Sequence, residues 1–212
     1  MIIFVPIKEN SQRVSRKNFR LVDGVPLYKC VLRKLKNHKV FVSTDSEEIM
    51  RECNRDTSLS HIICYEREAE LCGDKVSVCD ILKDFILRFN ISKPVVQMHV
   101  TSPLLSVNTL EKAYENMKKY DSVVSCNTHQ VRLWRKEIYG YCPINHNPNK
   151  LEQTQDLPVY YEENSSFYMF NPNVIFSGNR IGNNPLFFPM KFPENIDIDV
   201  EEDWNIFMKI RR

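Results

Sequence analysis

The 212-residue sequence lacks both of the glycine-rich motifs that most often mark a phosphate site, G-x-x-x-x-G-K-[ST] and G-x-G-x-x-G. No apolar run approaches the roughly 18 residues that a membrane span requires, and the first residues show no leader cleavage site. The formal net charge of +2 is far below the basic excess of typical nucleic-acid-binding domains. These absences predict a cytoplasmic protein with neither a nucleic-acid nor a membrane partner.

Paired metal-binding cysteines are also missing. The chain has seven cysteines but no C-x-x-C pair, and its five histidines show no ligand spacing. An odd number of irregularly spaced cysteines is typical of reduced thiols that act as small hydrophobic residues. We therefore expect neither a disulfide framework nor a Cys/His metal site.

What the sequence does contain is a regular alternation of short apolar strands and amphipathic helices. Hydrophobic residues make up 42% of the chain, enough for a sizeable core, and the length suits one domain over residues 1–212. The pattern predicts an α/β fold with a mostly parallel sheet. The expected strands are 2–5, 39–43, 61–65, 94–100, 122–126 and 163–170, and the expected helices are 26–36, 45–54, 76–89 and 108–119.

Side-chain caps predict where several helices begin. Asp45 with Glu48, and Asn108 with Glu111, have the spacing of capping boxes. Ser77 has the residue type and position of an N-cap for the helix that follows it.

The first expected strand leads directly into a basic loop. Small polar residues (Asn10, Ser11, Ser15, Asn18) alternate in it with cations (Lys8, Arg13, Arg16, Lys17, Arg20). Hydroxyls, backbone N–H groups and fixed positive charges are what a polyanion site needs. The alternative is a solvated basic surface loop, since runs of charge usually face water.

Two aspartates near the end of the chain suggest a cation site. Asp197 and Asp199 are two residues apart, so in a strand both would point to one face. Two such carboxylates repel unless a cation lies between them, and Mg²⁺ accepts one or two carboxylates together with water and phosphate oxygens. A competing interpretation makes Asp199 and Glu202 a capping box for the last helix.

After the strand at 122–126 the pattern breaks: residues 129–163 are rich in Tyr, Asn, His and Pro and include an unperiodic polar run from Asn145 to Asp156. Trp134, Tyr139 and Tyr141 fit either an interface or the core of a local hairpin. A segment this long without regular elements is either functional or packs against another surface.

Four motifs in order resemble those of the CMP-sugar synthetases, the acylneuraminate cytidylyltransferases and their relatives. They are P-I-K-E-N-S-Q-R-V-S-R-K-N at 6–18, V-S-T-D at 42–45, T-S-P-L at 101–104 and I-D-I-D-x-x-x-D at 196–203. The chain departs from the family pattern at Lys8 and Leu105, where the family has arginine, and at His99, where it has glutamine. Ser15 replaces a proline, and Ser165 replaces a glycine beside Asn164.

The resemblance implies a three-layer, Rossmann-like nucleotide-diphospho-sugar transferase fold, in which residues 129–163 form an extension that covers the sugar site and builds a homodimer. It implies transfer of CMP from CTP to a sialic-acid-like 2-keto-3-deoxy sugar acid with release of pyrophosphate, assisted by Mg²⁺. By resemblance the catalytic residues are Lys8, Lys17, Asp197 and Asp199, and the last two are the metal ligands. The nucleotide and phosphate contacts are Lys8, Ser11, Arg13, Lys17, Asn18 and Ser77, and the sugar contacts are His99, Thr101, Asn164 and Tyr168.

Three questions stay open at this point: the function, the role of Ser77 and the identity of the general base. The enzyme could act on a different sugar or nucleotide, or the chain could be a catalytically degenerate nucleotide-binding or scaffold protein. Ser77 could be only a helix cap. The general base could be His99, a metal-bound hydroxide or the carboxylate of the sugar.

Overall fold

A seven-stranded sheet forms the centre of the computed structural model, which describes residues 1–11 and 13–211. The strand order is β11-β7-β10-β6-β1-β4-β5. Six strands run parallel, and β10 is antiparallel to both of its neighbours. The bounds are β1 Ile2–Ile7, β4 Lys39–Thr44, β5 Ile62–Glu66, β6 Val95–Met98, β7 Ser122–His129, β10 Tyr160–Phe170 and β11 Pro185–Pro189.

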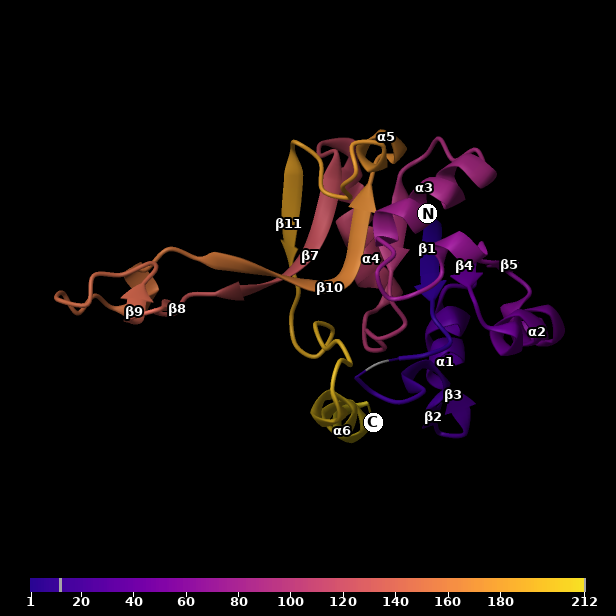
Figure 1. Cartoon of the computed structure of the whole chain (residues 1–212), viewed down its shortest axis with the longest axis horizontal. Coiled ribbons are helices and arrows are strands. Elements are labelled where there is room, and N and C mark those ends of the chain that lie inside the picture. The colour runs from indigo at the N-terminus through magenta and orange to yellow at the C-terminus, as the bar shows by residue number, and fades with distance from the viewer. Residues whose placement is uncertain (12, 212) are drawn as a thin grey trace.

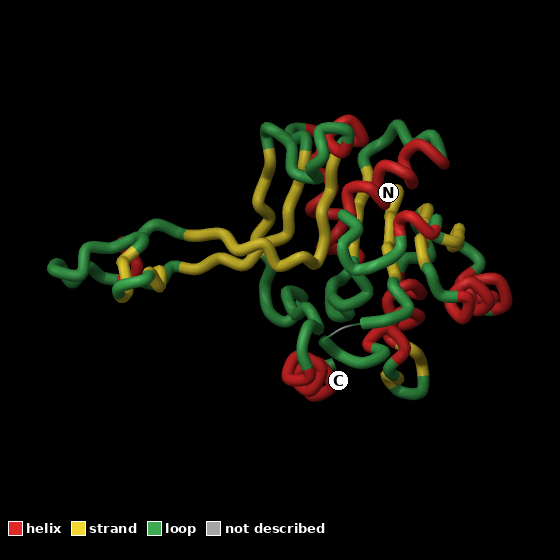
Figure 2. Tube along the Cα trace, in the orientation of Figure 1, coloured by secondary structure: helices red, strands yellow, loops and turns green. Residues whose placement is uncertain are grey.

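Helices cover both faces of this sheet (Figures 1 and 2). Because side chains alternate along a strand, Ile3 and Val5 pack on one face with α1 (Leu27–Lys34), α2 (Glu47–Arg55) and α4 (Val107–Tyr114). Phe4 and Phe41 pack on the other face with α3 (Val78–Arg88) and α5 (Pro172–Ile175). The predicted three-layer α/β architecture with a mostly parallel sheet is confirmed.

A third, smaller cluster attaches the end of the chain to this body. The last helix, α6 (Glu201–Ile210), contributes Phe207, which packs with Leu27 of α1 and with Ile198. Val22 joins the cluster from a short hairpin formed by β2 (Leu21–Val22) and β3 (Val25–Pro26). The basic N-terminal loop and the C-terminal acidic segment therefore lie next to each other.

The predicted helix starts at Asp45 and Asn108 are wrong by one or two residues. The N-caps are Ser46 and Ser106, and the hydroxyl of Ser106 accepts a hydrogen bond from the Thr109 N–H at 3.1 Å. Asp45 is drawn away from α2 because its carboxylate accepts the N–H of Glu9 at 2.7 Å. Ser77 does cap α3, accepting the Cys79 N–H at 3.2 Å.

The C-terminal acidic segment also differs from the prediction. Residues 196–199 are irregular rather than a strand, because Ile198 bonds through its N–H to the Thr101 carbonyl instead of pairing with a sheet edge. The capping box of Asp199 with Glu202 is wrong as well. The carboxylate at the start of α6 is Asp203, which accepts the N–H groups of Asp199 and Val200 at 2.8 and 2.9 Å.

A long arm projects from the sheet between β7 and β10 (Figure 1). Its outer part is a two-stranded hairpin of β8 (Trp134–Glu137) and β9 (Gly140–Pro143). The arm exposes apolar side chains, among them Ile138 and Leu151, each 91% exposed, and Tyr139, which is fully exposed. Residues 129–163 thus bury little of their own apolar surface.

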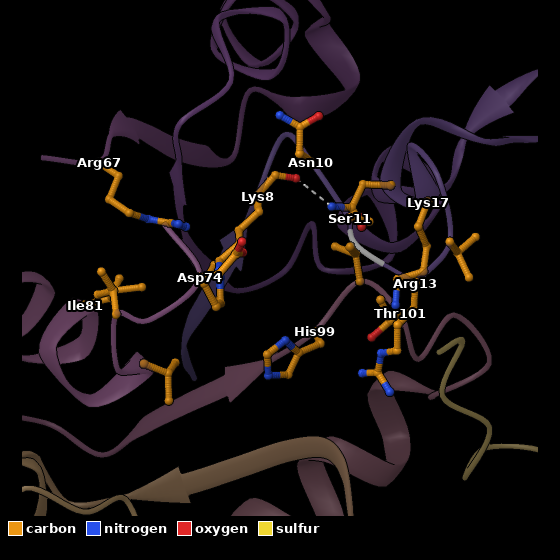
Figure 3. Close-up of a pocket in the computed structure, with 16 residues that line it drawn as sticks. Lys8, Asn10, Ser11, Arg13, Lys17, Arg67, Asp74, Ile81, His99 and Thr101 are labelled. Atoms are coloured by element: carbon orange, nitrogen blue, oxygen red, sulfur yellow. Dashed lines mark hydrogen bonds and ion pairs between the residues drawn. The ribbon is translucent and has the colours of Figure 1, made fainter. Parts of the chain in front are cut away.

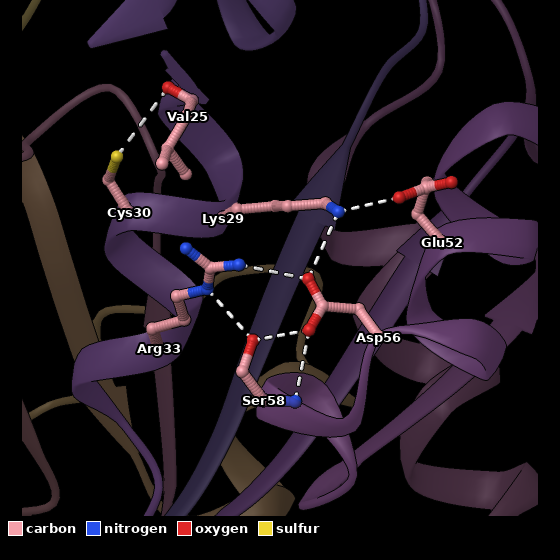
Figure 4. A network of polar contacts seen from close by, with 7 residues as sticks. All are labelled: Val25, Lys29, Cys30, Arg33, Glu52, Asp56 and Ser58. Carbon is pink, nitrogen blue, oxygen red and sulfur yellow. Dashed lines mark hydrogen bonds and ion pairs between the residues drawn. The ribbon is translucent and has the colours of Figure 1, made fainter. Parts of the chain in front are cut away.

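A polar network joins α1 to the end of α2 (Figure 4). Lys29 donates to Glu52 at 2.6 Å and to Asp56 at 3.1 Å, and Arg33 donates to Asp56 at 3.0 Å. Asp56 also accepts the N–H and hydroxyl of Ser58. The buried stem of Lys29 is held between the two helices by these contacts.

No helix in residues 1–11 and 13–211 is long and apolar enough to cross a membrane.

Candidate active site

The residues that directly follow four parallel strands gather at one edge of the sheet. Lys8 follows β1, Asp45 follows β4, Arg67 follows β5 and His99 follows β6. Parallel strands end at the same edge, and a crevice forms where the strand order reverses, here between β1 and β6. The topology therefore brings together side chains that are up to about ninety residues apart in sequence.

A pocket of about 380 Å³ lies at this edge (Figure 3). Its walls come from the N-terminal loop, from the segment that leads into α3, and from the end of β6. The polar and charged residues that line it are Lys8, Asn10, Ser11, Arg13, Lys17, Asn18, Arg67, Asp74, His99 and Thr101. Five of the six predicted nucleotide and phosphate contacts are thus brought together; Ser77 is not among them, although its neighbours Val76 and Val78 are.

The first cation of the loop bridges two walls of the pocket. The ammonium of Lys8 donates to the Gly73 carbonyl at 2.9 Å and lies 3.5 Å from the Asp74 carboxylate. The Asn18 amide donates to the Lys8 carbonyl at 2.8 Å. Asn18 is itself buried, so it fixes the loop that carries Lys8.

Two further cations of the loop meet the C-terminal acidic segment. Arg13 lies 2.9 Å and Lys17 3.4 Å from the same oxygen of Asp199, and Lys17 also donates to the Ile198 carbonyl. The remaining loop cations, Arg16 and Arg20, are paired elsewhere with Glu48 and Glu201. The basic loop is therefore divided between pocket cations and surface ion pairs.

Arg67, like Asp74, is a pocket residue that the sequence analysis missed as a predicted contact. It is 3% exposed, and its guanidinium donates to the carbonyls of Ile7 and Ser43 at 3.3 and 2.9 Å. One terminal nitrogen, Nη1, has no hydrogen-bond partner among the described residues. A buried guanidinium keeps its charge, so Arg67 adds positive potential to the wall of the pocket, which favours a bound anion. Its position two residues after the expected strand 61–65 was the available signal.

A second cavity of about 430 Å³ holds the predicted metal carboxylates. Asp197, Asp199 and Asp203 line it together with Asn127 and Asn164. Burial raises the pKa of the Asp197 carboxyl above its usual range, although Thr101 donates to it, and the neighbouring charge of Asp199 adds to the increase. Such a pair of carboxylates gains from an added cation.

The predicted sugar contacts are divided among three places. His99 and Thr101 line the first pocket and Asn164 lines the second. Tyr168 lines neither, because it is 1% exposed in the core and donates its hydroxyl to Glu163 at 2.7 Å.

Asn164 lies within a register shift in the pairing of β10 with β7, between Glu163 and Tyr168. Ser165, within the shift, has a φ of 59°, a conformation that glycine adopts more readily. Leu105, which stands at a family arginine, is 4% exposed in the core and contributes to neither cavity.

Comparison with known proteins indicates the family to which the chain belongs. A curated N-acylneuraminate cytidylyltransferase A from Danio rerio is 32% identical over 206 residues, covering 92% of this chain and 47% of that protein. CMP-N,N'-diacetyllegionaminic acid synthase from Legionella pneumophila is 26% identical over 230 residues, covering 99% and 95%. The chain spans about half the length of the first curated relatives it matches, at 47% and 46%.

Among solved structures, that of CMP:2-keto-3-deoxy-manno-octonic acid synthetase complexed with CTP is similar to this fold. Its TM-score is 0.69 at 12% identity, and the match covers 99% of this chain and 97% of that one. A 4-diphosphocytidyl-2C-methyl-D-erythritol synthase from Anaerococcus prevotii has a TM-score of 0.66 at 13% identity and covers 100% and 96%. The family model described as Cytidylyltransferase matches residues 2–209, and the chain therefore belongs to the cytidylyltransferase family.

Proposed function

We propose that this protein transfers CMP from CTP to a sialic-acid-like 2-keto-3-deoxy sugar acid and releases pyrophosphate. The observation that carries the proposal is the convergence of Lys8, Arg13, Lys17 and Arg67 on a pocket that adjoins Asp197 and Asp199. Family membership supports it, and so do the names of the curated relatives.

Three of the pocket cations have a direct role in this proposed reaction. When the sugar hydroxyl attacks the α-phosphorus, negative charge develops on the pyrophosphate leaving group, and catalysis depends on positioning and on offsetting that charge. Lys8, Arg13 and Lys17 line the same pocket and would together offset the charge of a triphosphate, and Ser11 adds a hydroxyl donor. Asn18 contributes indirectly by fixing the Lys8 backbone.

The carboxylates suit a divalent cation of the magnesium type. No group of three or more His, Cys, Asp or Glu ligands exists among residues 1–11 and 13–211, so a site made wholly of protein ligands does not fit. Mg²⁺ needs only one or two carboxylates and takes its other ligands from water and phosphate. Asp197 and Asp199 would hold it, and when bound it would act as a Lewis acid at the α-phosphate.

The acceptor sugar would occupy the second cavity beside Asn164, and the arm at 129–163 would serve a homodimer. Exposed apolar side chains on the arm support this assembly, since an isolated two-stranded hairpin is only marginally stable in water. Seven unpaired thiols, with Cys142 exposed, support a reducing compartment such as the cytoplasm.

A binding protein without turnover is the second candidate. One observation favours it: Asp199 already shares an oxygen with Arg13 and Lys17, so this carboxylate has cationic partners without a metal.

Thermal unfolding with CTP, UTP, ATP and GTP, each with and without Mg²⁺, tests the nucleotide site. A ligand at about a hundred times its dissociation constant adds about 2.7 kcal/mol to the free energy of unfolding. We expect a shift of several degrees with CTP and Mg²⁺ and a smaller one with the other nucleotides. If none of the four nucleotides shifts the unfolding temperature, the proposal is wrong.

Pyrophosphate release from CTP with a panel of 2-keto-3-deoxy sugar acids then separates the two candidates. Asp197→Asn should abolish release while CTP still shifts the unfolding temperature, because the amide keeps the shape and loses the charge. The control is Glu115→Gln, the same carboxylate-to-amide change in an exposed surface pair with Lys118, which should turn over normally. A wild-type protein that binds CTP and releases no pyrophosphate with any sugar would favour the binding protein.

A further inference from the structure

A chain of hydrogen bonds runs beneath the pocket from Arg180 to His99. Arg180 donates through Nη1 to the Oε1 atom of Gln97 at 2.9 Å, and Nε2 of Gln97 lies 2.7 Å from Nε2 of His99. The Arg180 guanidinium also lies over the Tyr168 ring, 3.5 Å from its centroid. Gln97 is fully buried, so its amide has no water to bond instead.

The order of donors and acceptors in this chain permits one arrangement. A guanidinium has only N–H donors, so the Gln97 atom that faces Arg180 must be its oxygen. The other end of the amide is then the NH₂ group, which is also a donor. Nε2 of His99 must therefore accept, and in a neutral imidazole the single proton then resides on Nδ1.

We infer that Arg180 and Gln97 hold His99 as the neutral Nδ1–H tautomer, so that His99 serves as a fixed hydrogen-bond donor to a substrate oxygen rather than as the general base. The identity of that oxygen, on CTP or on the acid sugar, rests on the proposed function. The tautomer itself does not, because it follows from the contacts of the protein alone.

The surroundings of His99 agree with this assignment. The ring lies at the base of the pocket, below Lys8 and Asp74 (Figure 3). Nδ1 makes no hydrogen bond to any described residue, and Nε2, the only ring nitrogen with a lone pair, is occupied by Gln97. Burial lowers the pKa of His99 to about 4. The positive charges of Arg180 and Lys17 lower it further, while the negative charge of Asp199 raises it, and the ring is neutral at pH 7.

Arg180 and Gln97 are positioning residues in this scheme, and His99 is the group that touches substrate. Sequence alone did not reveal the link, because Arg180 is 83 residues from Gln97 and belongs to none of the four motifs.

The tautomer can be measured directly in the ¹⁵N-labelled apo protein by two-bond ¹H–¹⁵N NMR at pH 7. We expect a protonated Nδ1 and an unprotonated Nε2 for His99. His61 is an internal reference of the opposite kind, because its Nε2 lies 3.1 Å from the Leu32 carbonyl oxygen and so carries the proton. A protonated Nε2 on His99 in this spectrum overturns the inference, whether or not the protein binds CTP.

Variants test the cause of the tautomer. Gln97→Glu replaces the NH₂ donor by an acceptor oxygen, so the proton of His99 should move to Nε2, while the His61 signals stay in place. Arg180→Met keeps apolar contact with Tyr168 but releases the Gln97 oxygen, and a mixture of both tautomers should result. An unchanged Nδ1–H form in a folded Gln97→Glu protein contradicts the assigned cause.

Steady-state kinetics locate the acceptor and exclude a base. His99→Ala should raise the KM for one of the two substrates, CTP or the sugar, by about 10- to 100-fold, which is the effect of losing one hydrogen bond to a charged acceptor. An increase for the sugar places the acceptor on the sugar, and one for CTP places it on the nucleotide. His99→Asn, which keeps an N–H near the Nδ1 position but cannot take up a proton, should recover much of that loss. Equal loss of kcat in both variants, with KM unchanged, would indicate a general base and overturn the inference.

Discussion

Arg67 has the most constrained surroundings of the pocket cations. Its guanidinium is buried, yet its hydrogen bonds go to the main-chain carbonyls of Ile7 and Ser43 and to the Ser43 hydroxyl, not to a carboxylate. Burying a charge without a counter-ion is costly, so a bound anion would recover part of that cost. In the proposed function, the residue would thus link the stability of the strand ends to nucleotide binding.

Arg67→Lys should affect both properties. An ammonium cannot reproduce the planar fork, so at least one of the carbonyls of Ile7 and Ser43 loses its donor, and we expect about 1–3 kcal/mol less stability in urea unfolding. The unused Nη1 donor is lost as well, and the dissociation constant of CTP measured by calorimetry should rise about 10- to 100-fold. Arg51→Lys, the same change at an exposed position on α2, is the control. Unaltered CTP affinity in folded Arg67→Lys would show that the Arg67 guanidinium does not contribute to nucleotide binding.

At the scale of elements, polar contacts between helices replace some of the apolar packing. Lys29, Arg33, Glu52 and Asp56 tie α1 to the end of α2, on the face of the sheet opposite α3 (Figure 4). Asp56 accepts the largest number of these bonds. A hydrogen bond from the Ser58 hydroxyl, followed by hydrogen bonds from Lys29, from the Ser58 N–H and from Arg33, holds the pKa of Asp56 well below its usual range.

This depressed pKa predicts an acid-dependent contribution to stability. A carboxyl whose pKa is lower in the folded state stabilises the protein above its unfolded pKa of about 3.9, and the contribution is lost as the pH falls toward the folded pKa. Asp56→Asn should cost about 1 kcal/mol at pH 7, since Arg33 and Glu52 are partly exposed and solvent screens the ion pairs. The difference between variant and wild type in urea unfolding should shrink below about pH 4. A difference that is constant from pH 7 to pH 3 would contradict this account.

At the scale of the whole molecule, the arm is the feature on which the proposed homodimer depends. It extends away from the three-layer body and carries Ile138, Tyr139 and Leu151 on its surface (Figure 1). Hydrophobic area exposed together on a projecting element is typical of an interface between protein chains. A second copy of the chain is the proposed partner.

Replacing Tyr139 and Leu151 together by serine should weaken the homodimer. We expect the mass measured by light scattering during size exclusion to fall from that of a dimer toward 25.1 kDa as the protein is diluted. Leu87→Ser, on the exposed side of α3 and away from the arm, should leave the mass unchanged. A wild-type protein that is monomeric at every concentration would refute the proposed assembly.

Local sequence patterns were sufficient for the architecture. The continuous apolar run of Ile3, Phe4 and Val5 predicts a strand buried on both faces, and the helical spacing of Ile81, Leu82 and Phe85 predicts α3. Both patterns are local, because they depend on residues that are near one another in the chain. The same applies to the cations from Lys8 to Lys17, which one loop carries together. Motif order added the family.

Tertiary structure decided the partners of each polar group. Ser106 rather than Asn108 caps α4, and Asp203 rather than Glu202 accepts the N–H groups at the start of α6. Arg67 lines the same pocket as Lys8, from which it is distant in sequence. The link from Arg180 through Gln97 to His99 is of the same kind. Hydrophobic periodicity is a local property, whereas a hydrogen bond requires two specific atoms to meet within about 3 Å, and only the folded sheet brings such atoms together.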